Sequence, residues 1–185
     1  MPEKRIIGSG TLLDSARLRS RIAECVSINQ KDVHAFVLGE HGDSSFVPWS
    51  TVRISSLGLE DYRAHLNYHE DFTAELDLGE IENYIRTSGG KVIQRKGATF
   101  YAIAVSVCDI VKTLLNGSDS VLCISSMMHG EFGIEDVCLS IPTIVNGQGI
   151  KGTLLPELTQ DEVAQLRHSA DVLKEVIGQI DFEQA

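Results

Sequence analysis

The runs Val121-Leu-Cys-Ile-Ser-Ser-Met-Met128 and Val137-Cys-Leu-Ser-Ile-Pro-Thr-Ile144 decide the fold. Both runs read as β-strands, and the turn residues around His129-Gly130-Glu131 that separate them predict an antiparallel hairpin. Hairpins separated by helices are typical of α+β folds, whereas a doubly wound sheet needs parallel strands with helical crossovers. The sequence therefore predicts an α+β fold, with antiparallel hairpins packed against long helices and no Rossmann domain.

Four long helices are expected outside this hairpin, and the polar stretch over residues 58–78 is expected to form a short helix and a loop. Apolar residues recur at helical spacing in three predicted helices, over residues 12–26, from 81 onward and over 98–115. A capping box of Thr159 and Glu162 predicts the start of a fourth helix. Its apolar stripe is expected to be core: Val163, Leu166, Ala170, Leu173 and Ile177. Gly89-Gly90 weakens the second helix and is expected to kink it without touching any candidate site residue.

Two further strands are predicted on the N-terminal side of the hairpin. The first covers Val33–Leu38 and the second Phe46–Ile54. Between them lies the tight polar turn Gly39-Glu40-His41-Gly42-Asp43, which displays His41 at the end of a strand.

One glycine-rich motif imitates a nucleotide-binding loop. Gly147-Gln-Gly-Ile-Lys-Gly152 fits the G-x-G-x-x-G pattern, but a phosphate-binding loop must open a helix. The following Thr153-Leu-Leu-Pro156 reads instead as a strand that ends at proline. The motif is therefore predicted to be a hairpin turn, and the chain is not expected to bind NAD unaided.

Composition excludes several classes of protein. A length of 185 residues fits a single domain over residues 1–185, since domains usually hold about 100 to 200 residues. The net charge of -10 disfavours nucleic acid and anionic membranes as general partners. The four cysteines form no C-x-x-C pair, so we expect reduced thiols and no metal site. Without a signal peptide or an apolar run of ~20 residues, a cytoplasmic location is expected.

Three residues could together carry acid–base chemistry. Asp14 and Arg17 are three positions apart on the first predicted helix and share a face, whereas Arg19 points nearly opposite. Arg17 offers a planar fork for a carboxylate, and Asp14 could orient and charge the ring of His41. The alternatives are a surface ion pair for Asp14 with Arg17, and an ordinary turn residue for His41.

Two strings, Ile7-Gly-Ser-Gly-Thr-Leu-Leu-Asp-Ser-Ala-Arg-Leu-Arg19 and Leu38-Gly-Glu-His-Gly-Asp-Ser44, closely resemble the L-lactate dehydrogenases of the lactate/malate dehydrogenase family. The resemblance continues through Arg95–Ala104 and, more loosely, to the final helix. It implies that His41 is the proton donor and acceptor, that Asp14 pairs with it, and that Arg17 holds the substrate carboxylate.

The same resemblance assigns three residues of the substrate and cofactor pocket. It implies that Thr99 lines the substrate pocket, that Ile103 packs beside the nicotinamide ring of NAD, and that Ser9 hydrogen-bonds its carboxamide. The alternatives are a helix N-terminal residue for Thr99, plain core for Ile103 and a turn residue for Ser9.

Arg19 and His34 resemble the pair that binds fructose 1,6-bisphosphate across a subunit interface in many bacterial L-lactate dehydrogenases. This implies an allosteric homotetramer in which two copies supply both residues. The alternative is a solvated arginine and a histidine at the start of a strand.

The resemblance also implies that something is missing. Full members carry an NAD-binding domain ahead of the Ile7–Arg19 string, and we expect that domain to be absent here. With it, the protein is expected to interconvert pyruvate and L-lactate in glycolysis and lactate fermentation; alone, the chain is expected to be inactive. Two alternatives stay open: a related 2-hydroxy-acid (malate) dehydrogenase fragment, and a non-catalytic assembly or effector-binding module.

Overall fold

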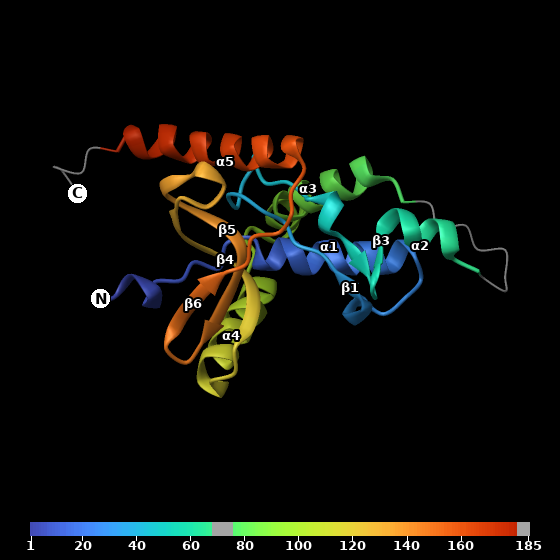
Figure 1. Ribbon diagram of the computed structural model, residues 1–185, viewed down its shortest axis with the longest axis horizontal. Coiled ribbons are helices and arrows are strands. Elements are labelled where there is room, and N and C mark those ends of the chain that lie inside the picture. Colours follow the sequence, from blue (N-terminus) through green and yellow to red (C-terminus); the bar gives the residue numbers. More distant parts are fainter. Residues whose placement is uncertain (68–75, 181–185) are drawn as a thin grey trace.

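The computed structural model describes residues 1–67 and 76–180, and a three-stranded antiparallel sheet lies at its centre (Figure 1). Strand β4 (Ser120–His129) pairs with β5 (Glu135–Asn146), and β5 pairs with β6 (Gly149–Thr153). The predicted hairpin and the α+β fold class are confirmed. Neighbouring residues of β4 enter different cores, because side chains alternate across a sheet: Cys123 packs with the cluster that includes Leu166, and Ile124 with Leu12 and Ile110.

All four predicted helices are present. They are α1 (Leu12–Cys25), α3 (Leu78–Lys96), α4 (Tyr101–Asn116) and α5 (Gln160–Gly178), and a short α2 (Leu59–His65) lies between the first two. Gly97 and Gly117 end α3 and α4 in the left-handed conformation that favours glycine. Within the described residues, four single turns of 3-10 helix accompany these helices: Glu3–Arg5, Gln30–Asp32, Trp49–Thr51 and Glu131–Gly133.

Helix α5 begins with the predicted capping box, in which Thr159 and Glu162 bond each other's backbone. Leu166 and Ala170 are buried against the sheet, as predicted. The prediction was wrong for Ile177, which is 39% exposed, because the last turns of α5 extend beyond the sheet (Figure 1).

The two N-terminal strands are much shorter than predicted. Only β1 (Val33–His34), β2 (Arg53–Ile54) and β3 (Leu57–Gly58) form the second sheet. At Val37, side chains take the place of hydrogen bonds to a neighbouring strand. Ser15 accepts a hydrogen bond from the Val37 N–H, and Thr11 donates one to the Val37 carbonyl. The backbone beyond β1 is thereby tied to α1.

The G-x-G-x-x-G motif forms a hairpin between β5 and β6, as predicted, with Asn146 paired to Gly149. The following strand was placed wrongly, since β6 starts at Gly149 and ends at Thr153. Gly149 has φ +104°, and a Cβ there would overlap the Lys4 carbonyl, so this glycine serves a turn and a close backbone contact.

Helix α3 runs without interruption through Gly89 and Gly90, so the glycine pair does not break the helix. Each glycine costs a helix interior about 1 kcal/mol relative to alanine, and the packing of Ile81 and Ile85 in the core supports the helix despite this cost. No helix in residues 1–67 or 76–180 has the length and apolar character needed to cross a membrane.

Candidate active site

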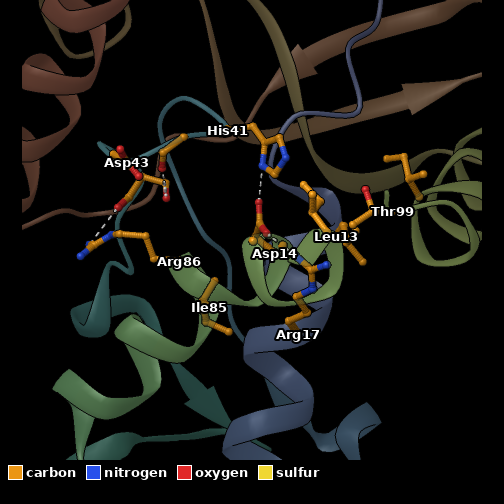
Figure 2. Close-up of a pocket in the computed structure, with 14 residues that line it drawn as sticks. Leu13, Asp14, Arg17, His41, Asp43, Ile85, Arg86 and Thr99 are labelled. Atoms are coloured by element: carbon orange, nitrogen blue, oxygen red, sulfur yellow. Dashed lines mark hydrogen bonds and ion pairs between the residues drawn. The ribbon is translucent and has the colours of Figure 1, made fainter. Parts of the chain in front are cut away.

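A cavity of about 290 Å³ lies between α1, the turn at residues 41–45, α3 and the start of α4 (Figure 2). Helix α1 contributes Asp14 and Arg17 to its lining, and α3 contributes Arg86 together with apolar and small residues. Asp14, Arg17, His41, Thr99 and Ile103, five of the residues predicted to form the site, all line this cavity.

The Asp14 carboxylate is the centre of the charged part. It lies in the first turn of α1, where the positive end of the helix dipole stabilises an anion, and its side chain is only 9% exposed. Its Oδ2 is 2.6 Å from Nδ1 of His41, and its Oδ1 accepts a hydrogen bond of 3.1 Å from Nη1 of Arg17. Two cationic or cation-forming groups are thus positioned by one buried carboxylate.

The His41 ring is accessible from the cavity and is more basic than an ordinary histidine. The hydrogen bond to Asp14 raises the pKa of the ring above its ordinary value; partial burial and the charge of Arg17 oppose this. The ring is 63% exposed, so a ligand in the cavity can reach it. With Nδ1 engaged by Asp14, Nε2 is the nitrogen that can exchange a proton with that ligand.

Arg17 and the residues from α4 complete the site. The Arg17 side chain is 16% exposed and lines the cavity beside Asp14 and His41. Thr99 and Ile103 come from the start of α4 and the residues before it. Ser9 does not line the cavity; it precedes α1, and its carbonyl accepts a hydrogen bond from the Leu12 N–H.

Sequence reasoning missed the other nine lining residues: Leu13, Gly42, Asp43, Ser45, Ile85, Arg86, Gly89, Gly90 and Ile93. Gly89 and Gly90 line the same cavity as Asp14, Arg17 and His41, although a Cβ added at either glycine would meet no atom within 4 Å. They share a face of α3 with Ile85 and Ile93, at spacings of four and eight residues that bring side chains together on a helix. That spacing is visible in the sequence, but which face meets the site is not.

Arg19 and His34 lie together at a second cavity of about 260 Å³, on the other side of α1. Arg19 donates a hydrogen bond of 3.2 Å to the Ala35 carbonyl, and burial lowers the pKa of its guanidinium group. Lys31 adds a third basic group to the lining. The two arginines that are two residues apart in sequence therefore face different cavities, as their spacing predicted.

No group of three or more histidine, cysteine, aspartate or glutamate side chains could hold a metal ion in the part of the chain that the structure describes. The four cysteines are free, and burial raises the pKa of the Cys123 thiol to about 11, which makes it a poor nucleophile.

The fold and the cavity define a class of protein: an α+β fold with a histidine–carboxylate pair beside an arginine, suited to acid–base chemistry on a substrate that carries a carboxylate. Residues 11–183 match the model of the lactate/malate dehydrogenase, alpha/beta C-terminal domain. The chain belongs to this family.

The relatives are L-lactate dehydrogenases. The enzyme of Oceanobacillus iheyensis is 40% identical over 174 residues, covering 94% of this chain and 53% of the relative. L-lactate dehydrogenase 2 of Clostridium acetobutylicum is 43% identical over 176 residues, covering 95% and 54%. A solved L-lactate dehydrogenase from Clostridium thermocellum superposes with a TM-score of 0.87 at 36% identity, covering 98% of this chain and 58% of that one. The chain thus spans about half the length of the relatives it matches.

Proposed function

We propose that this chain is the catalytic, substrate-binding part of an L-lactate dehydrogenase that interconverts pyruvate and L-lactate with NADH and NAD. The observation that carries the proposal is the contact of the Asp14 carboxylate with both His41 and Arg17 inside one cavity. The resemblance to L-lactate dehydrogenases over nearly the whole chain supports it.

In the proposed reaction Arg17 binds the pyruvate carboxylate through its planar fork and orients the ketone towards His41. The protonated ring of His41 gives the Nε2 proton to the ketone oxygen, and takes it back from lactate in the reverse direction. Asp14 holds the Nδ1 proton and stabilises the charged ring. Thr99 borders the substrate.

NADH, when bound, supplies the hydride. Ile103 is suited to pack against the nicotinamide ring, because it lines the cavity with an apolar side chain. Ser9 lies near the start of the same helix as Asp14. The described residues offer no phosphate-binding loop, since the G-x-G-x-x-G motif is a β-hairpin. We therefore propose that residues 1–185 form a single domain that needs an NAD-binding domain for activity and is inactive alone.

Arg19 and His34 form the proposed activator site, with the phosphates of fructose 1,6-bisphosphate bound between two copies in a homotetramer. Their position on one cavity with Lys31 supports this proposal. A cytoplasmic enzyme of glycolysis and lactate fermentation, without nucleic acid or membrane partners, fits these assignments. A malate dehydrogenase fragment or a non-catalytic module are the alternatives, and the naming of the relatives as L-lactate dehydrogenases favours lactate over malate.

The test is a chimera that joins the N-terminal part of the Oceanobacillus iheyensis enzyme to this chain, with NADH oxidation by pyruvate as the readout. The unmodified chimera is expected to reduce pyruvate. His41→Gln is expected to lower kcat about 100- to 10,000-fold, the usual contribution of a general acid.

Arg17→Lys is expected to raise KM, because lysine cannot form the two parallel hydrogen bonds of a guanidinium group. His168→Gln, an exposed position on α5, is the matched control and should retain activity. A folded chimera that binds NADH but does not reduce pyruvate would contradict the proposal.

A further inference from the structure

The backbone on either side of His41 is held by α5, none of whose described residues lines the cavity. The Oγ of Ser169 accepts a hydrogen bond of 2.8 Å from the Glu40 N–H, and it lies 2.9 Å from the Oγ of Ser44, within hydrogen-bonding distance. Ser169 is fully buried. One hydroxyl group of α5 thus joins the residue before His41 to the far end of the same turn.

This contact begins where the pairing of the chain with β5 ends. Gly39 exchanges two backbone hydrogen bonds with Ser140, of 3.1 and 2.9 Å. A Cβ at Gly39 would lie 2.6 Å from the Ser169 Oγ, and the φ of this glycine is +95°. A glycine is therefore needed here so that α5 can approach the backbone closely. Glu40 is the next residue, and Ser169 binds its N–H.

The His41 ring projects into the cavity and is 63% exposed. Its Nδ1 lies 2.6 Å from the Asp14 carboxylate, as Figure 2 shows. Packing does little to aim a side chain that is largely exposed, so its direction depends on this hydrogen bond and on the backbone from which it projects. Asp14 fixes the ring, and Ser169 fixes the backbone beside it.

We propose that Ser169 is a positioning residue whose hydroxyl group holds the turn of residues 40–44, so that the Nε2 of His41 is aimed at the substrate. The inference rests on the proposed function and adds to it a residue that acts through His41, since Ser169 itself does not line the cavity. Without the hydroxyl group the Glu40 N–H loses its acceptor. A displacement of the turn that lets water reach this N–H then moves His41 as well.

A purely structural role of Ser169 would leave the chemistry of His41 unchanged. The charged groups around the ring are Asp14 and Arg17 of α1, Glu40 and Asp43 of the turn, and Arg86 of α3. Ser169→Ala changes none of these charges. A shift of the His41 pKa in this variant therefore reports a change in the geometry of the ring relative to Asp14.

The first measurement is an NMR titration of the His41 ring protons in the whole chain, with His41→Gln used for assignment. Ser169→Ala is expected to lower the His41 pKa towards the ordinary value of histidine, because the hydrogen bond to Asp14 that raises it is weakened. Ser106→Ala is the matched control. It removes another buried hydroxyl group, which donates to the Ala102 carbonyl within α4 at 3.2 Å, and should leave the His41 pKa unchanged.

The second measurement is the kinetics of the chimera with pyruvate. Ser169→Ala is expected to lower kcat roughly 10- to 100-fold, since a misplacement of about 1 Å can cost roughly a hundredfold. KM should change little, because Arg17 belongs to α1.

Ser44→Ala removes the second partner of the Ser169 hydroxyl group and is expected to lower kcat in the same direction by a smaller factor. Adding Ser44→Ala to Ser169→Ala should cause little further loss, because the two hydroxyl groups bond each other and their effects are not additive.

An unchanged His41 pKa and an unchanged kcat in Ser169→Ala would overturn the inference and leave Ser169 with a structural role alone. If Ser169→Ala does not fold, Ser44→Ala decides, and wild-type values of both quantities in that variant would overturn the inference as well. A wild-type chimera that binds NADH without reducing pyruvate would refute the proposed function, while the His41 pKa would still show whether Ser169 positions the ring.

Discussion

Asp14 and His41 are 27 residues apart in the chain, yet their side chains form a contact of 2.6 Å that joins the first turn of α1 to the turn after residue 40. The carboxylate is nearly buried and the ring is largely exposed. The pair is therefore anchored in the protein interior through Asp14 and accessible from the cavity through His41.

The first prediction concerns the pKa of His41. Asp14→Asn removes the hydrogen bond to a charged acceptor that is the main cause of the raised pKa, so the ring should titrate at lower pH in the variant. An NMR titration of the ring protons measures this. The pKa of His129, which Glu3 raises outside this cavity, should be the same in both proteins. An identical His41 pKa in variant and wild type would show that Asp14 does not charge the ring.

The same shift makes the stability of the fold depend on pH. His41 has a higher pKa in the folded chain than its ordinary value of about 6.5, so the folded state binds the proton more tightly. This stabilisation is fully present below pH ~6.5 and is lost as the pH rises through the folded pKa. Urea unfolding across this range should show the loss in the wild type, and a smaller one in Asp14→Asn.

The second prediction concerns the cavity at Arg19 and His34. Fructose 1,6-bisphosphate should bind the chain in calorimetry, accompanied by a stable oligomer in light scattering, because each phosphate group needs clustered cations. Arg19→Ala should abolish both. Arg5→Ala removes an equal charge outside this cavity and is the control. A well-folded oligomer that ignores the ligand would leave Arg19 and His34 without an activator role.

The third prediction concerns the attachment of α5. Glu162 accepts hydrogen bonds from the Ser50 N–H and hydroxyl at 3.0 and 2.5 Å, and from the Thr159 N–H at 2.8 Å. Glu162 is buried, and Glu162→Ala removes these hydrogen bonds to a charged acceptor, so the variant should lower the free energy of unfolding by about 1–3 kcal/mol. Chemical denaturation measures the change. Glu175→Ala, exposed on the same helix, should change it little; equal losses at both positions would refute the assignment.

Local signals carried most of the fold. The β4–β5 hairpin, the helices and the Thr159–Glu162 capping box depend on neighbours in the chain, and all were predictable. The strand predicted over Val33–Leu38 was too long because the partners of Val37 are side chains of Thr11 and Ser15, more than twenty residues away. The local sequence pattern does not reveal that side chains from α1 and its N-cap take the place of hydrogen bonds between strands.

The candidate site, too, was predictable only in part from the sequence. Asp14 and Arg17 are three residues apart on one helix, and the motif around His41, which resembles L-lactate dehydrogenases, identified His41 as the partner of Asp14. Arg86 and the glycine pair were missed because their part in the cavity depends on how α3 rotates against α1. The sequence shows which residues share a face of α3 but not what that face meets.

Helix α1 also lies between two cavities and presents one arginine to each. Arg17 and Arg19 are separated by about 200° around its axis and about 3 Å along it, and each faces a different cavity. If α1 turns as a rigid body, the two guanidinium groups swing in opposite directions. Any displacement of α1 at one cavity would therefore also move the arginine at the other, because both side chains belong to the same helix.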